Sequence, residues 1–163
     1  MKVFGKKRYN HLLAVITCFA FLSAIGCAHT PPYQQTGKYS EYIGEKAVRT
    51  ALTMIGRPYK YRGESPSGFD CSGLVKFSYH AAGMDVPHGT QQLKNMTRTV
   101  SVRSMKKGDL LFFNENGKKY SHVGLYSGNG FFVHAPSSGQ TVRQDSLQDD
   151  YWKKHFLEAR RLQ

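Results

Sequence analysis

The pattern of apolar and polar residues changes character along the chain. Residues 12–25 are almost continuously apolar, residues 40–96 place apolar side chains at helical spacing, and residues 109–135 contain short aromatic and β-branched runs. Recurrence every three to four residues is typical of helices, whereas short runs bounded by turn residues are typical of strands. Helices followed by strands predict an α+β fold.

Helix boundaries can be predicted from capping residues. Ser40 is a suitable N-cap for a first helix that extends to about Gly56, and Asp70 is a suitable N-cap for a second, which Gly83 ends. We expect a loop over residues 57–69. The expected second and third helices cover residues 71–82 and 91–96.

The second half of the chain predicts an antiparallel sheet. Asn116-Gly117 and residues 127–130 are turn signals between short strand-like runs. Strands this close in sequence form a meander, because parallel strands need longer crossover connections. The expected strands cover residues 109–113, 122–126 and 131–135, and residues 156–162 are expected to add a strand at the edge of the sheet.

The N-terminal segment, residues 1–26, has the features of a secretory signal peptide. Four basic residues precede an apolar run that is shorter than the about 20 residues of a membrane-spanning helix. The run ends in Ala24-Ile25-Gly26-Cys27, which resembles the lipobox of bacterial lipoproteins, in which the cysteine is acylated. We expect removal of residues 1–26 and lipidation of Cys27, with ordinary secretion as the alternative.

The remaining chain is expected to form one domain, residues 40–163, on a flexible tether, residues 27–39. The signal peptide holds four of the 23 basic residues and none of the 11 acidic ones, which leaves a net charge of +8. This charge favours anionic polymers such as the carboxylate-rich bacterial wall. Basic runs interleaved with stacking aromatics are absent from the sequence, so we expect no nucleic acid partner.

The three cysteines have different expected fates. Cys18 lies in the signal peptide and Cys27 is the expected lipid acceptor, so Cys71 is left without a disulfide partner. A lone cysteine can be a small core residue. Cys71, however, would lie in the first turn of a helix, where the helix dipole lowers a thiol pKa, and Gly73 would leave room for a substrate.

Two histidines complete a candidate catalytic group. His122 begins one expected strand and His134 lies near the end of the next, so hairpin pairing would bring their rings together. We expect Cys71 as nucleophile, His122 as general base and His134 as the group that orients His122. Zinc bound by these three residues is the less favoured alternative, and we expect neither a metal nor a cofactor.

Six short motifs resemble those of the NlpC family of cell-wall peptidases, in the family's order, and the resemblance spans residues 42–162. It implies a papain-like fold and hydrolysis of peptidoglycan stem peptides, usually between γ-D-glutamate and diaminopimelate or lysine. The motifs are Tyr59-Lys-Tyr61, Gly68-Phe-Asp-Cys-Ser-Gly-Leu-Val75, Gly108-Asp-Leu-Leu-Phe-Phe113, Ser121-His-Val-Gly124, Phe132-Val-His-Ala135 and Tyr151-Trp152 with Ala159-Arg-Arg161.

The resemblance also implies roles for single residues. Cys71, His122 and His134 match the family's catalytic residues, Tyr59 matches the tyrosine near the oxyanion site, and Asp70 and Ser72 match residues that hold the stem peptide's free amine. The chain departs from the family at Arg62-Gly63, where two glycines are common, and at His88, where arginine is frequent.

Two other functions share these features. A binding module for peptidoglycan would keep the cleft without the activity, and a papain-like acyl or amide transferase would use the same thiol. We expect a monomer that acts on stem peptides and is held to a membrane through its N-terminal lipid. Ala28 after Cys27, in place of aspartate, favours the outer membrane of a Gram-negative cell, facing the periplasm.

Overall fold

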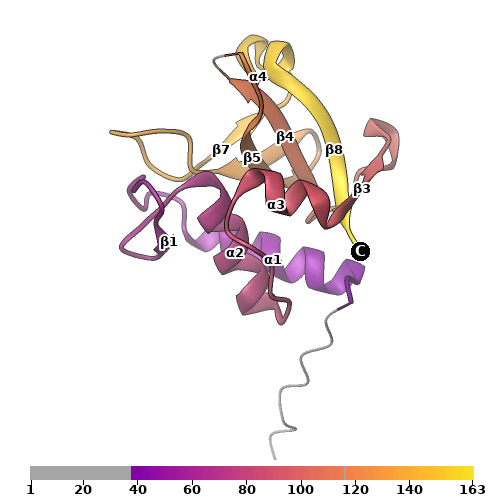
Figure 1. The fold of residues 1–163 in the computed structure, drawn as a ribbon, viewed down its shortest axis with the longest axis horizontal. Coiled ribbons are helices and arrows are strands. Elements are labelled where there is room, and N and C mark those ends of the chain that lie inside the picture. Colours follow the sequence, from indigo (N-terminus) through magenta and orange to yellow (C-terminus); the bar gives the residue numbers. More distant parts are fainter. Residues whose placement is uncertain (1–37, 116) are drawn as a thin grey trace, which may run out of the picture. The chain divides into compact units, whose positions relative to one another are not determined.

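The computed structural model describes residues 38–115 and 117–163 (Figure 1). The expected signal peptide, Cys27 and the tether up to residue 37 lie outside them. The helices are α1 (Glu41–Thr53), α2 (Cys71–Ala82), α3 (Thr90–Asn95) and α4 (Asp150–His155), with a 3₁₀ turn at Val102–Ser104. The strands are β1 (Glu64–Ser65), β2 (Gly68–Phe69), β3 (Thr97–Val100), β4 (Leu110–Glu115), β5 (Lys118–Gly128), β6 (Phe131–His134), β7 (Arg143–Ser146) and β8 (Phe156–Leu162).

The first two helices begin where their capping residues predict. The Ser40 hydroxyl accepts a hydrogen bond from the Ile43 backbone N–H at 3.3 Å. Asp70 accepts one from the Gly73 N–H at 2.7 Å. Gly83 ends α2 in the left-handed conformation, with φ of 101°. α1 and α2 lie side by side (Figure 1), and α2 contacts β5. The predicted loop before Asp70 contains the short pair β1–β2.

One six-stranded antiparallel sheet has the order β3-β8-β4-β5-β6-β7. The run from β4 to β6 is the expected meander, and β7, which the sequence pattern did not predict, extends it. The prediction that residues 156–162 form an edge strand was wrong, because β8 pairs with β3 on one side and with β4 on the other. Its partner β3 is a Thr-Arg-Thr-Val segment of four residues, too short to show an alternating apolar pattern.

Alternating side chains of the sheet enter two separate cores. Phe112 and Val123 belong to the cluster that includes α1 and α2, whereas Phe113 and Phe132 belong to a cluster that includes Trp152 of α4. His122 is the direct cross-strand partner of Phe113 and therefore lies on the Trp152 side of the sheet. The two-sided core thus brings α2 and α4 to opposite faces of the strands that hold the histidines.

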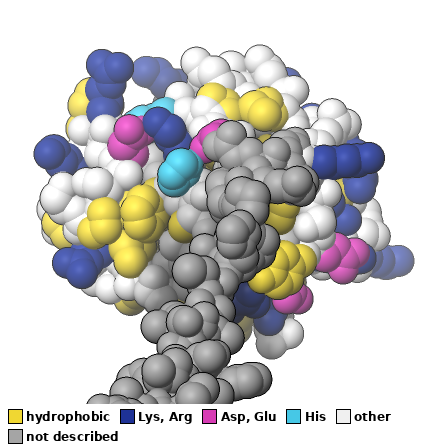
Figure 2. Space-filling view, turned by 90° about the horizontal axis from the view of Figure 1, so that it is seen from below, with side chains coloured by type: hydrophobic (Ala, Val, Ile, Leu, Met, Phe, Trp, Pro, Cys, Tyr) yellow, Lys and Arg dark blue, Asp and Glu magenta, His cyan; other side chains and the backbone are white. Residues whose placement is uncertain are grey.

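No helix within the described residues is long and apolar enough to cross a membrane. Figure 2 shows Lys and Arg side chains spread over the visible face without gathering into a single basic patch.

Candidate active site

Cys71 is the first residue of α2, and its side chain is partly buried. The backbone N–H groups of Val123 and Ser72 act on the thiol and favour its ionised form. Val123 directly follows His122 in β5, so the start of the helix meets the strand that holds the expected base. The fold therefore brings the nucleophile candidate to the histidine strand.

Burial raises the pKa of the Cys71 thiol to about 12, and the neighbouring Asp70 carboxylate adds to the rise. The two backbone N–H groups act in the opposite direction but do not outweigh burial. The helix start acts on this pKa in the expected direction, through the Ser72 N–H, but burial sets the net shift. The resting thiol is protonated, and nucleophilic attack requires a base to take its proton.

A line of hydrogen bonds connects the two histidines to Asp145. His122 Nε2 lies 2.8 Å from His134 Nδ1, and His134 Nε2 lies 2.9 Å from the Asp145 Oδ2. The ionised carboxylate can only accept, so His134 donates from Nε2 and its Nδ1 accepts from His122 Nε2. Nδ1 of His122 is then the unprotonated nitrogen, which gives His122 the tautomer of a general base.

The pKa values of these groups agree with this tautomer assignment. Burial lowers the pKa of His122 well below its usual value, and His134 lowers it further. Burial also lowers the pKa of His134, although Asp145 opposes that shift. Burial alone would raise the pKa of Asp145, but hydrogen bonds from His134, Arg143 and Trp152 outweigh it and hold this pKa far below its usual range. Neutral histidines and an ionised carboxylate follow.

Trp152 fixes the other side of this line. Its indole Nε1 donates to Asp145 Oδ2 at 2.8 Å, and its ring stacks on His122 with centroids 5.4 Å apart. The sequence pointed to Trp152 only as part of a family motif and gave no role to Asp145. Asp145 lies in the polar Arg-Gln-Asp-Ser strand β7, which pairs with the His134 strand but which the sequence pattern did not predict.

A cleft of about 440 Å³ opens beside Cys71. It contains the three residues expected to bind substrate, Tyr59, Asp70 and Ser72, so the structure brings them together with the nucleophile candidate. Burial raises the pKa of Tyr59, with Cys71 adding to the rise, and the phenol stays a hydrogen-bond donor at neutral pH. The cleft is lined by Tyr59, Tyr61, Arg62, Asp70, Cys71, Ser72, His88, Gly89, Thr90 and Ser121.

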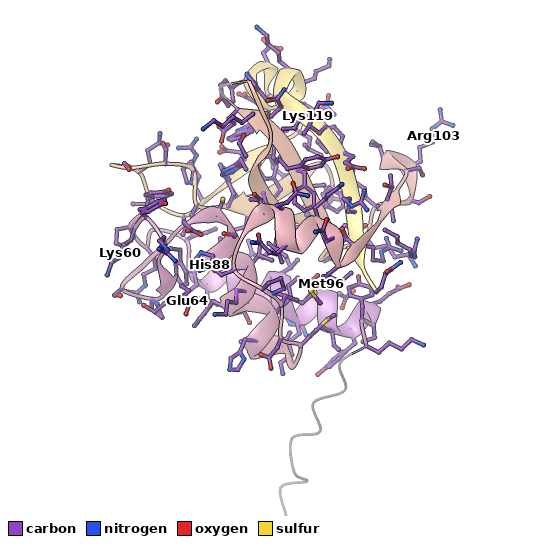
Figure 3. The ribbon with its side chains drawn as sticks, viewed as in Figure 1. Lys60, Glu64, His88, Met96, Arg103 and Lys119 are labelled. Carbon is purple, nitrogen blue, oxygen red and sulfur yellow. The ribbon has the colours of Figure 1, made fainter. Side chains whose placement is uncertain are left out.

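The two departures from the family pattern meet at Asp70. His88 Nε2 lies 2.9 Å from both Asp70 oxygens, and the Arg62 backbone N–H donates to Asp70 at 3.1 Å. His88 Nδ1 also lies 3.3 Å from Glu64, and Figure 3 shows these two side chains beside each other. Arg62 has φ of 56°, a left-handed conformation that glycine adopts more readily, which explains why glycine suits this position.

Gly73 has a different role from the one predicted. A Cβ at this position would lie 1.9 Å from the Gly63 carbonyl oxygen, so the space is filled by the preceding loop and does not serve a substrate. The same Gly63 carbonyl accepts the Asp70 backbone N–H at 3.0 Å. The small residue lets the loop lie directly against the start of α2.

Metal ligation was the alternative use of these side chains. Among the residues that the structure describes, no group of three or more His, Cys, Asp or Glu side chains is arranged to hold a metal ion.

Residues 56–161 match the family described as NlpC/P60. The chain is 37% identical over 127 residues to the Murein DD-endopeptidase MepH of Escherichia coli, which covers 72% of this chain and 47% of that protein. It is 33% identical over 130 residues to the Probable endopeptidase NlpC homolog of Haemophilus influenzae, covering 78% of this chain and 68% of that protein.

The solved structures give the same result for the fold. An NLP/P60-family protein of Staphylococcus aureus, described as similar to lipoprotein, superposes with a TM-score of 0.67 at 31% identity, covering 77% of this chain and 43% of that one. The expected α+β, papain-like fold is thereby confirmed. The chain spans 47% of the length of MepH, 36% of CwlT and 50% of YafL, three relatives whose names include endopeptidase.

Proposed function

Because this chain belongs to the NlpC/P60 family, we propose that it is a cysteine endopeptidase that cleaves the stem peptides of peptidoglycan. The observation that carries the proposal is the line from Asp145 through His134 to His122, which leaves a basic nitrogen on the strand that Cys71 contacts. The names of the relatives, which include peptidoglycan and murein endopeptidases, support the substrate class.

The proposed reaction begins with transfer of the Cys71 proton to His122 Nδ1. The thiolate attacks the scissile carbonyl carbon, and the oxyanion that forms is stabilised by backbone N–H groups at the start of α2 and by the Tyr59 hydroxyl. His122 then gives its proton to the leaving amine, and a thioester remains on Cys71. Water, deprotonated by His122, attacks the thioester and regenerates the thiol.

The bond proposed for cleavage joins γ-D-glutamate to diaminopimelate. In that substrate, Asp70 and Ser72 would hold the free amine of the stem peptide at the cleft beside Cys71. The names of the relatives include both bond types: CwlT and CwlO are named as DL-endopeptidases, and MepH is named as a DD-endopeptidase. An experiment therefore has to distinguish cleavage of an uncrosslinked stem peptide from cleavage of a crosslink.

The location that we propose is the cell envelope, with Cys27 lipidated after removal of residues 1–26. The lipobox-like sequence supports a lipid anchor, and Ala28 supports the outer membrane in a Gram-negative cell. Two or three acyl chains would give a stable anchor, because each buried methylene contributes about 0.8 kcal/mol. Residues 27–39 would then act as the tether between the membrane and a monomeric domain.

The test is mass spectrometry of purified muropeptides after incubation with the full chain or with its Cys71→Ala variant. An uncrosslinked tetrapeptide and a crosslinked dimer are tested in parallel. Release of a diaminopimelate-containing dipeptide by the wild type alone would establish the DL bond, whereas conversion of the dimer to monomers would establish the DD bond. If neither substrate changes, a peptidoglycan-binding module becomes the better explanation, and sedimentation with sacculi tests it.

The transferase alternative shares the thioester step, so only the acceptor distinguishes it. Adding a primary amine or a lipid acceptor to the same incubation shows whether the acyl group goes to water or to the added acceptor. A product mass that contains the acceptor, formed faster than the hydrolysis product, would contradict the peptidase proposal.

A further inference from the structure

The carboxylate of Glu115, the last residue of β4, lies against the nitrogen of His122 that is available to act as base. Glu115 Oε2 is 3.4 Å from His122 Nδ1, and the two do not form an aligned hydrogen bond. The Glu115 side chain is 21% exposed, so water screens it only in part. Neither the sequence motifs nor the proposed reaction uses this residue.

Glu115 is held in this place from two directions. Its Oε1 accepts a hydrogen bond from the Tyr151 hydroxyl of α4 at 2.8 Å. Its backbone N–H donates to the Ser121 hydroxyl at 2.7 Å, and that hydroxyl donates to the Glu115 carbonyl at 3.2 Å. These contacts hold both the end of β4 and the Glu115 carboxylate in place. The position of the carboxylate beside His122 Nδ1 is therefore a fixed part of the site.

The position of the charge favours one protonation state of His122. Beside an unprotonated Nδ1, the carboxylate faces a lone pair and has no attraction to it. Once Nδ1 takes the proton of Cys71, the carboxylate faces a cation at salt-bridge distance. The same carboxylate disfavours the Cys71 thiolate and raises the thiol pKa, after the larger effects of burial and Asp70.

We infer that Glu115 is a positioning residue that stabilises the protonated form of His122 during attack by Cys71. The inference rests on the proposed function for its role in catalysis, but the electrostatic contact exists without it. The other titratable and charged groups that act on Cys71 and His122 come from the start of α2 and from β6 and β7. They are Asp70, His134, Arg143 and Asp145.

The test compares the full chain with its Glu115→Gln variant in two pH titrations. One follows muropeptide hydrolysis, and the other follows alkylation of Cys71 by iodoacetamide, read on the Cys71 peptide by mass spectrometry so that Cys18 and Cys27 do not contribute. Removing a negative charge lowers the pKa of both neighbours. We expect the alkaline limb of hydrolysis and the midpoint of alkylation to move to lower pH by about one unit.

Two control variants separate charge from structure. Tyr151→Phe removes the hydrogen bond that anchors Glu115 but keeps the charge. Glu158→Gln changes a glutamate of equal exposure, 21%, that also accepts from a tyrosine, Tyr120, at 2.8 Å, but is not among the groups that shift the pKa of Cys71. Glu158→Gln should leave the pH profiles in place, and Tyr151→Phe, which keeps the charge but loosens its position, should shift them less than Glu115→Gln does.

An unchanged alkaline limb in Glu115→Gln, or an equal shift in Tyr151→Phe, would overturn the inference. If Glu115→Gln does not fold, Glu115→Asp withdraws the carboxylate from Nδ1 by one methylene and should give a smaller shift in the same direction; no shift would count against the inference. If no muropeptide is cleaved by the wild type, the proposed function fails, and the alkylation titration still decides whether Glu115 acts on the site.

Discussion

The ring of His122 stacks on the indole of Trp152, with their planes inclined by 25°. The same indole donates a hydrogen bond to Asp145, which in turn accepts from His134. The four side chains therefore form a closed arrangement, in which the base is held by a ring face on one side and by a hydrogen-bonded line on the other. A base held in this way keeps its tautomer and its direction between catalytic cycles.

Variants of the three predicted catalytic residues should differ in severity. Cys71→Ala and His122→Ala should abolish muropeptide cleavage, whereas His134→Ala should leave residual activity. Removing an orienting group slows the reaction less than removing the nucleophile or the base. Cleavage rates and circular dichroism of each variant check this. Complete unfolding of all three variants would contradict the assignment of roles.

Asp145→Asn should lower kcat by about 10- to 100-fold with little change in KM, because His134 loses a charge-assisted hydrogen bond while the cleft beside Cys71 is untouched. Steady-state kinetics on a muropeptide measure both constants. Asp150→Asn, an exposed acid at the start of α4, is the matched control and should leave both constants unchanged. A change confined to KM would show that Asp145 acts in substrate binding.

The stability of the domain should fall as the pH drops below about 4, in part because of Asp145. A carboxylate with a lowered pKa in the folded state stabilises the fold above its unfolded pKa, and this contribution disappears as the pH falls towards the folded pKa. Urea unfolding at about pH 6 and pH 3 measures the loss. The Asp145→Asn variant should lose less stability over this interval than the wild type, and an equal loss would contradict the assignment.

His88→Ala should raise KM by about three- to tenfold and leave kcat nearly unchanged, because His88 contacts Asp70 in the cleft but none of the groups that transfer protons. Kinetics with an uncrosslinked tetrapeptide provide the measurement. His80→Ala, on an exposed histidine of α2 that pairs with Asp85, serves as the control. A fall in kcat without a change in KM would remove His88 from substrate binding.

Arg161→Leu should destabilise the domain by about 3–5 kcal/mol, because it leaves the fully buried Asp109 without its cationic partner. Arg161 donates to both Asp109 oxygens at 2.7 Å, and this pair raises the pKa of Arg161. Chemical denaturation measures the change. Arg103→Leu, on an arginine that Figure 3 shows projecting from the molecule, should change stability much less. Equal effects would contradict a structural role for the buried pair.

Local signals accounted for the elements that the sequence predicted well. Asp70 and Gly83 set both ends of α2, and the meander followed from short runs separated by turn residues. The pairing of His122 with His134 followed from their places on one hairpin. In each case, residues close in sequence carried the information.

The missed features depend on contacts between distant segments. β8 could not be placed inside the sheet because its partner β3 is far from it in the sequence and has a weak pattern. Asp145, Trp152 and Glu115 look like ordinary polar or packing residues in sequence. Only the fold brings Trp152 and Glu115 to His122, and Asp145 to its partner His134. The net thiol pKa depends on the fold for a related reason, since burial outweighs the local effect of the helix start.

The inner position of β8 has a consequence for the order in which the domain can fold. β3 has β8 as its partner in the sheet, and residues 156–162 follow every other strand that the structure describes. A growing chain can form the β4–β7 meander early, but it cannot join β3 to that meander before residues 156–162 emerge. Synthesis from the N-terminus thus leaves the sheet incomplete, with β3 unpaired, until β8 is made.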